Sequence, residues 1–212
     1  MPTAKAVKAM DNRVQLYGTV AEPPTFSHAI GANRLYRCEL EVPRLSGVVD
    51  RVPLLLPERL EPSMRGQVGV LGQLRGYSRQ EEGRRRLRLM VLVKALLDGP
   101  AEVNNLVELR AQLLRPPTYR KTPMGREIAD LLLRAERERG GEDCIPAIVW
   151  GGCARYARTL EKGQWLQLQG RIQSRPYMKQ LENGSICELI AYELSVNKLR
   201  LSQEYVGKTF IK

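Results

Sequence analysis

An internal repeat limits the folds open to this chain more than any other feature of its sequence. Residues 12–26, NRVQLYGTVAEPPTF, align with residues 105–119, NLVELRAQLLRPPTY, so that Asn, Val, the Pro-Pro-Thr run and the final aromatic residue coincide at a constant offset. Further blocks match in the same order, residues 50–53 on 143–146 and residues 66–77 on 163–177. Several blocks in one order indicate duplication of a unit of domain size.

The chain length agrees with two units of this kind. A chain of 212 residues allows one large domain or two of about 100 residues each. The turn-forming run Asp98-Gly99-Pro100 favours a boundary between Leu97 and Val103. We therefore expect an N-terminal domain over residues 1–100 and a C-terminal domain over residues 101–212.

The second unit has the patterns of a β-protein. Polar residues alternate with apolar ones from Leu106 to Leu113 and from Trp165 to Ile172, which is typical of strands with one buried face. Further strands are expected at Ile128–Ala135, Ile145–Trp150 and Ile186–Leu199. The helical spacing of Ala154, Ala157 and Leu160 predicts a short helix after the third strand, with Gly163 as its stop. This order is expected of an OB barrel.

The first unit follows the same scheme. Its expected strands are Val14–Val20, Leu35–Val42, Val52–Leu56, Val68–Leu74 and Leu87–Leu96. Pro57 and Pro62 make a full helix after its third strand less favourable than in the second unit. The predicted fold class is all-β, with two tandem OB-fold barrels of the five-stranded Greek-key type, each with at most one short helix.

The charge of the chain favours a polyanionic partner. The formal net charge is +11, and both halves carry an excess of Lys and Arg. Such an excess attracts nucleic acid, although a basic surface that only maintains solubility is the alternative. No apolar stretch suits a secretory signal or a membrane span, so a cytoplasmic protein is expected.

Cysteine and histidine usage gives no support for a metal, a cofactor or an enzyme. The four cysteines are scattered without a CxxC pair, which favours free thiols in a reducing compartment, and no cofactor is expected. His28 is the only histidine, and no Gly-rich phosphate-binding motif occurs. Glu136 and Glu138 lie in a charge-rich segment that is typical of a solvated arm. An enzyme that uses an OB domain as a substrate clamp would need catalytic residues that the sequence does not offer.

The second unit carries motifs of a known family. These are RPPTYRKTPMGREIADLLL at residues 115–133, DCIPAIVWGGCARYARTLEKG at residues 143–163 and LQLQGRIQSRPY at residues 166–177. With them, the chain from Asn105 to about Leu199 resembles the bacterial single-stranded DNA-binding protein (SSB) family, including its primosomal replication protein N branch. The first unit resembles this family chiefly through its similarity to the second.

The resemblance implies a set of nucleic-acid-binding residues. Trp150 and Tyr177 stand at positions where the family stacks bases on aromatic rings, and the alternative for each is a place in the core. Tyr119 is expected in the binding loop, whereas Trp165 is expected to pack against the barrel. The basic residues expected near phosphates are Arg120, Lys121, Arg126, Arg155, Arg158, Arg171, Arg175 and Lys179. In the first unit, the corresponding residues are Tyr77, Arg84, Arg85 and Arg86.

The chain also departs from the family pattern. Cys144 stands where the family has a further aromatic residue, and Leu55 and Leu56 lie in the region that corresponds to Trp150. The first barrel is therefore expected to hold DNA by charge alone or to contact another subunit. The end of the chain, LSQEYVGKTFIK, lacks the acidic tip through which family members recruit replication enzymes.

Two functions are consistent with these features. The first is sequence-independent binding of single-stranded DNA, with RNA as an alternative ligand, in replication, recombination or plasmid transfer, by a homodimer that presents four OB folds. The second is an OB-fold adaptor in a replication or conjugation complex, with incidental DNA affinity. Neither function requires a membrane or a small-molecule substrate.

Overall fold

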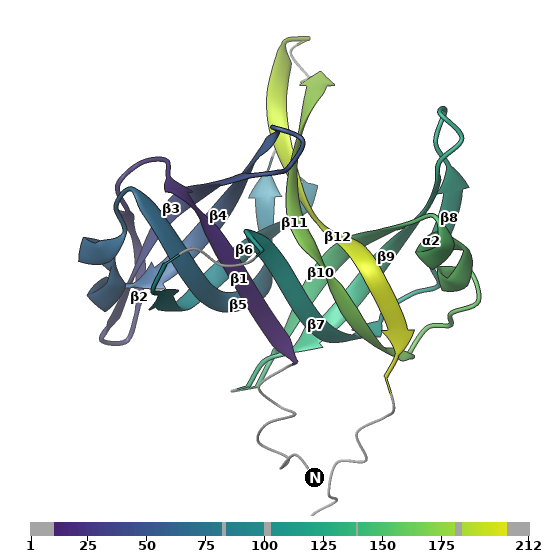
Figure 1. Ribbon diagram of the computed structural model, residues 1–212, viewed down its shortest axis with the longest axis horizontal. Coiled ribbons are helices and arrows are strands. Elements are labelled where there is room, and N and C mark those ends of the chain that lie inside the picture. The colour runs from purple at the N-terminus through teal and green to yellow at the C-terminus, as the bar shows by residue number, and fades with distance from the viewer. Residues whose placement is uncertain (1–10, 82–83, 100–102, 139, 181–183, 203–212) are drawn as a thin grey trace, which may run out of the picture.

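Two β-barrels stand side by side in the computed structural model (Figure 1). The structure describes residues 11–202 except 82–83, 100–102, 139 and 181–183. Within these residues, strands β1–β6 form the first barrel and strands β7–β12 form the second. In the part of the chain so described, no helix is long and apolar enough to cross a membrane.

The first barrel closes through five strands. In the order in which neighbours pair around the barrel, they are β1 (Asn12–Val20), β3 (Asn33–Pro43), β4 (Val49–Pro57), β6 (Arg84–Leu97) and β5 (Gln67–Glu81), which returns to β1. Only β4 and β6 pair in parallel. The short strand β2 (Thr25–Ile30) extends the sheet beyond β3, and the 3₁₀ turn η1 (Glu58–Ser63) follows β4.

The second barrel repeats this order. Its five closing strands are β7 (Asn105–Leu113), β9 (Glu127–Glu136), β10 (Glu142–Trp150), β12 (Ile186–Leu201) and β11 (Trp165–Gln180), with β10 and β12 parallel. The short strand β8 (Thr118–Lys121) pairs with β9, and helix α2 (Gly152–Ala157) follows β10. The long β11–β12 hairpin rises above the barrel as an arm (Figure 1).

The predicted all-β OB class is confirmed, with differences in detail. Each half has a sixth strand, β2 or β8, that the alternation did not reveal because its residues are mostly exposed and carry no period-2 apolar pattern. Helix α2 ends at Ala157, well before the predicted stop at Gly163. Pro62 lies within η1, and the first barrel has a 3₁₀ turn rather than an α-helix there.

Period-2 alternation builds the barrel interiors. In β7, Val107, Leu109 and Ala111 are buried, while Glu108 and Arg110 between them point outward. The same alternation in β1 buries Val14 and Leu16. Full burial of such side chains stabilises the fold by roughly 1.5–3 kcal/mol each, which fixes which face of each strand points inward.

The two barrels meet about an approximate two-fold axis. Strands β1 and β7 pair antiparallel with Val14 opposite Val107, and these two valines are equivalent positions of the repeat. Asn12 exchanges two hydrogen bonds of 2.8 Å with the backbone of Leu74, and its equivalent Asn105 does the same with Ile172 at 2.8 and 2.9 Å. Each asparagine bond lies within its own barrel, and the symmetric pairing of β1 with β7 joins the two units in the manner of an internal dimer.

Two fully buried carboxylates complete this junction. Asp50 accepts hydrogen bonds from the Arg44 guanidinium and from the backbone N–H of Ser174 in the other barrel, at 2.8 Å. Asp143 accepts from Arg137 and, across the junction, from Arg75 and the backbone N–H of Gly76. Buried charge of this kind is tolerated because each oxygen has hydrogen-bond partners.

Candidate nucleic-acid interface

A groove of about 1040 Å³ lies on the outer face of the second barrel. Its floor and sides come from β9, β10, β11 and β12, and one rim is formed by β8 and the turn that follows it. The opposite rim belongs to the first barrel, since Arg44 and Val48 also line the groove. The groove is therefore a feature of the pair of barrels rather than of one barrel.

The β9–β10 side of the groove is apolar, and Trp150 is the last residue of β10 on that side. The β12 side is mostly polar, with Glu193, Ser195 and Asn197 in the lining. Ile128 and Ile148 point outward from the barrel, yet each is at least 95% buried beneath the groove. Trp150 is paired with Ile128 in the β9–β10 register, and its side chain is 38% exposed. Trp150 is thus not a core residue. Its ring offers a surface on which a planar base can stack.

Four of the predicted basic residues line this groove. Arg171 and Arg175 project from the same face of β11. Arg120 and Arg126 come from the rim formed by β8 and the turn that follows it. Arg120 is paired with Asp130 at 2.9 Å. Among the residues that the structure describes, no carboxylate lies within 4.0 Å of Arg126, Arg171 or Arg175. These three guanidinium groups can therefore take phosphate oxygens.

Glu193 is an acid inside the groove that the motifs did not reveal. It lies on β12 opposite Gln173. Burial raises the pKa of its carboxyl, and this is the largest effect; the charge of Arg175 lowers the pKa, and that of Asp130 raises it. Arg120 and Arg44 also lower this pKa, with smaller effects. An ionised Glu193 would repel phosphates in the groove.

Tyr119, Lys121, Arg155 and Arg158 do not line the groove. Because successive side chains of a strand alternate, Tyr119 points away from the face that carries Arg120 and packs against the core near α2. Its hydroxyl donates to Glu127 at 2.6 Å, and the Arg158 guanidinium lies 4.6 Å above its ring. Arg155 pairs with Glu127.

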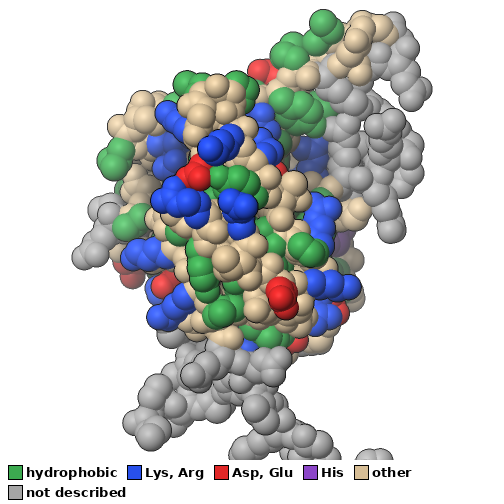
Figure 2. Space-filling model, turned by 90° about the vertical axis from the view of Figure 1, so that its right-hand side faces the viewer, with side chains coloured by type: hydrophobic (Ala, Val, Ile, Leu, Met, Phe, Trp, Pro, Cys, Tyr) green, Lys and Arg blue, Asp and Glu red, His purple; other side chains and the backbone are tan. Residues whose placement is uncertain are grey.

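The contacts among Tyr119, Glu127 and Arg155 shift the pKa values of the tyrosine and the glutamate. The hydrogen bond to Glu127 raises the pKa of Tyr119, and the same bond followed by Arg155 lowers the pKa of Glu127. Seen from the side of β8 and α2, Lys and Arg side chains gather around a small hydrophobic area (Figure 2). Arg155 and Arg158 are therefore basic surface residues engaged in contacts within the barrel.

The remaining predicted residues lie on the two hairpin arms. Tyr177 is half-buried on β11, two residues beyond Arg175, and Tyr77 of β5 is 37% exposed. Neither lines the groove. Tyr77 neighbours Tyr192, whose pKa is raised to about 12, mainly by burial and then by Glu39. The side chains of four predicted residues lie outside the described part of the structure: Lys179, Arg84, Arg85 and Arg86.

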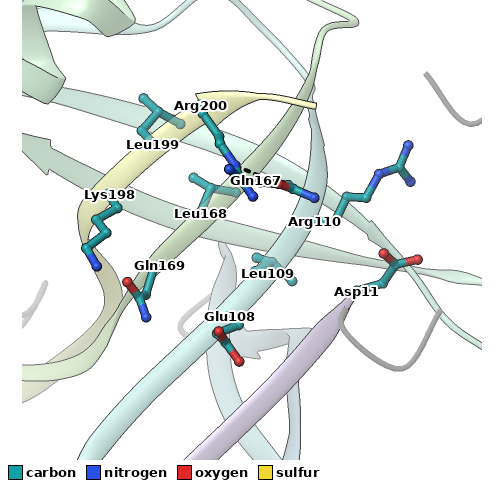
Figure 3. A pocket seen from close by; sticks show the side chains of 10 residues that line it. All are labelled: Asp11, Glu108, Leu109, Arg110, Gln167, Leu168, Gln169, Lys198, Leu199 and Arg200. Atoms are coloured by element: carbon teal, nitrogen blue, oxygen red, sulfur yellow. Dashed lines mark hydrogen bonds between the residues drawn. The ribbon is translucent and has the colours of Figure 1, made fainter. Parts of the chain in front are cut away.

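A second, smaller cavity lies on the face formed by β7, β11 and β12 (Figure 3). It measures about 520 Å³ and is lined by charges of both signs, such as Glu108 and Lys198. Arg200 donates to Gln167 across it at 2.7 Å (Figure 3). Beside it, the Arg110 guanidinium lies 4.2 Å above the Trp165 ring. Trp165 is thus covered on one face, and the cavity itself has no aromatic lining residue.

Cysteine and histidine side chains form no metal site in the residues covered by the structure. Cys38, Cys144, Cys153 and Cys187 are free thiols, and no group of three potential ligands occurs among the described residues. His28 is within 3.0 Å of the Ser27 hydroxyl in the β2 strand. Neither feature lies in the groove.

The barrel order and the shared groove define an OB-fold protein with two barrels in one chain. Residues 104–197 match the model of the single-strand binding protein family. This match confirms the resemblance that the motifs of the second unit indicated. The first barrel lies outside the matched residues. No curated protein gives a significant match to the chain.

Solved structures of one protein share the whole architecture. The wild-type single-stranded DNA binding protein from Thermus aquaticus is 22% identical, with a TM-score of 0.68 over 91% of this chain and 93% of that chain. A deletion mutant of the same protein gives a TM-score of 0.66 at 22% identity, over 91% of this chain and 95% of that chain. At this identity the similarity establishes the fold.

Proposed function

We propose that this protein binds single-stranded DNA without sequence preference, in the groove on its second barrel. The observation that carries the proposal is the exposed Trp150 beside the apolar Ile128 and Ile148, in a groove that Arg126, Arg171 and Arg175 also line. The family match of residues 104–197 supports the same conclusion.

The chemistry of the groove suits an unpaired strand. Each base has a flat π-face, so stacking on Trp150 contributes on the order of 1–3 kcal/mol per base and does not read sequence. Phosphates between the bases would be neutralised by the guanidinium groups, with release of counterions. Tyr177, further along the β11 arm, would extend the path of the strand beyond the groove.

The organisation of the protein is part of the proposal. We infer two domains, residues 1–100 and 101–212, and a homodimer that presents four OB folds in the cytoplasm. We propose no catalytic activity, since a coating function requires only affinity. RNA would enter the same groove, because stacking and phosphate contacts do not depend on the sugar.

The experiment is a titration with oligo-dT at two salt concentrations. Trp165→Phe leaves Trp150 as the remaining tryptophan, so quenching of its fluorescence would report contact with the bases. Trp150→Ala should weaken binding by roughly tenfold or more, from the loss of one stacked base. Tyr156→Ala is the matched control, because Tyr156 is also 38% exposed but lies on α2 outside the groove. Equal affinities of the two variants would contradict the proposal.

An adaptor function is the second candidate, and one observation favours it. In the first barrel, Pro57 and Leu55 occupy the positions equivalent to Trp150 and Ile148, so this barrel lacks the aromatic platform. A Trp150→Ala, Tyr177→Ala double variant distinguishes the candidates. An adaptor would keep its protein contacts and lose little function, whereas a coating protein would lose DNA binding.

A further inference from the structure

The turn between β3 and β4 of the first barrel reaches the groove of the second. Arg44 and Val48 line the groove, and the turn is closed by hydrogen bonds between Arg44 N and Val48 O at 2.8 Å and between Gly47 N and Arg44 O at 3.0 Å. Gly47 has a φ of 83°, which allows the sharp reversal. The turn lies at the base of the β11–β12 arm (Figure 1).

Arg44 is held rigidly in this position. Its Nε and Nη2 donate to the two oxygens of Asp50 at 2.7 and 2.5 Å, and the Asp50 side chain is fully buried. A paired, fork-like contact of this kind fixes the plane of the guanidinium. Asp50 takes Nε and Nη2, whereas Nη1 has no hydrogen-bond partner among the described residues. The Arg44 side chain is 20% exposed and lines the groove, so Nη1 can still donate to a phosphate oxygen.

The position of Arg44 continues the basic lining of the groove. Arg44 Nη2 lies 3.4 Å from the backbone oxygen of Ser174, the residue before Arg175. Asp50, which fixes Arg44, also accepts the backbone N–H of Ser174 at 2.8 Å. One buried carboxylate thus fixes both the Arg44 guanidinium and the backbone of β11 beside Arg175, and both arginines line the groove.

We propose that Arg44 contacts the phosphate backbone of bound single-stranded DNA, so that the strand lies across the junction of the two barrels. This inference rests on the proposed function of the groove. It assigns the first barrel a direct part in binding, although that barrel lacks the aromatic platform of the second. A strand that touches both barrels would also stabilise the junction between them.

The internal two-fold provides a matched control. Arg137 is equivalent to Arg44 in the repeat and makes the same paired contact with Asp143, at 2.9 and 2.6 Å, but it does not line the groove. Arg44→Gln and Arg137→Gln remove the same charge and the same paired contact, but Asp143 keeps its ion pair with Arg75, whereas Asp50 loses its only guanidinium partner among the described residues. Urea unfolding of both variants therefore accompanies the binding measurement, so that a loss of stability is not read as a loss of contact. Only Arg44→Gln would remove a phosphate contact.

The test measures the affinity for oligo-dT over a range of salt concentrations, with Arg171→Gln as a reference variant inside the groove. Arg44→Gln should weaken binding by roughly tenfold and reduce the slope of log affinity against log salt by about 0.7, the value for one contact to a single strand. Arg137→Gln should keep the slope of the natural sequence. Equal affinity of the Arg44 and Arg137 variants, with weaker binding by Arg171→Gln, would overturn the inference and leave the proposed function intact. Unchanged binding by Arg171→Gln and Trp150→Ala would overturn both.

A second pair of variants avoids the buried carboxylate. Val48 is 50% exposed and lines the groove, whereas the next residue, Val49, is 47% exposed and does not. Val48→Glu would place a negative charge beside the strand, so it should weaken binding several-fold, while Val49→Glu should have a much smaller effect. If the two glutamate variants bind equally, the strand does not pass this rim and the inference is wrong.

Discussion

Single residues decide how strongly this groove can hold a polyanion. Arg120 and Arg44 each donate two hydrogen bonds to an aspartate, while no carboxylate of the described residues lies within 4.0 Å of Arg126, Arg171 or Arg175. Glu193 works in the opposite direction, because it brings a carboxylate into the same groove. The affinity expected for a polyanion therefore depends on the balance of these charges and not on the number of arginines alone.

Replacement of Glu193 by Gln should strengthen DNA binding several-fold at pH 8, since removal of a nearby like charge is worth on the order of 1 kcal/mol at a surface. The raised pKa of Glu193 means that protonation begins above the usual range of a glutamate. In the natural sequence, affinity should rise as the pH falls through this pKa, because the neutral carboxyl no longer repels phosphate. The measurement is the affinity for oligo-dT from pH 5 to 8. If Glu193→Gln and the natural sequence have the same pH profile, Glu193 is not the group that titrates and the prediction is wrong.

The raised pKa of Glu193 also affects the stability of the folded protein. A carboxyl whose pKa is raised in the folded state binds its proton more tightly there than in the unfolded chain. Its contribution to stability is present at low pH and is lost as the pH rises through the folded-state pKa. Glu193→Gln should remove this loss, so the variant should be the more stable protein at pH 8.

At the scale of elements, the hairpin arms and the junction depend on each other. Each arm passes the other barrel at a residue whose backbone N–H is held by a buried aspartate, Gly76 with Asp143 and Ser174 with Asp50. The equivalence is not complete, because Ser174 has room for a side chain and Gly76 does not. A Cβ at Gly76 would overlap the backbone carbonyl of Cys144.

Gly76→Ala should therefore destabilise the protein by roughly 1–3 kcal/mol, the usual cost of excess volume in a closely packed site. Ser174→Ala is the equivalent change in the other barrel and removes a hydroxyl that accepts from Arg51 N at 3.0 Å and donates to Asp50 at 3.3 Å, at a cost of about 1 kcal/mol. Urea unfolding of both variants gives the comparison. An alanine at position 76 that costs no more than the one at position 174 would show that the arms do not pack as closely as described.

At the scale of the whole molecule, the duplication places in a single chain two barrels that pair as the subunits of a symmetric dimer would. Strand β7 pairs with β1 around Val14 and Val107, so each barrel covers a strand edge of the other. An uncovered edge offers unpaired N–H and C=O groups to any further strand. The two barrels are thus expected to depend on each other for solubility as well as for the groove.

This dependence predicts the behaviour of the second domain alone. Residues 101–212, produced without the first domain, should pair through two copies of β7 around Val107, since the register with β1 is already symmetric. Light scattering should then give a particle with at least two copies of this domain. A stable monomer would show that the β7 edge needs no partner.

The sequence alone determined the features that depend on local pattern. The repeat predicted two similar units, and period-2 alternation predicted the strands of each barrel. The motifs named some of the residues that line the groove, such as Trp150 and Arg171, but Arg155 and Arg158 of the same motifs do not line it. These inferences hold because alternation and motif spacing belong to one strand or to one barrel.

Only the tertiary structure decided which side chains share a surface. The register of β8 with β9 turns Arg120 into the groove and Tyr119 out of it, which no local pattern specifies. Arg44 and Glu193 are brought to the same groove by the two-fold packing of the barrels and by the pairing of β11 with β12. Contacts of this kind join residues far apart in the chain, so their position depends on the closed barrels and the angle at which they meet.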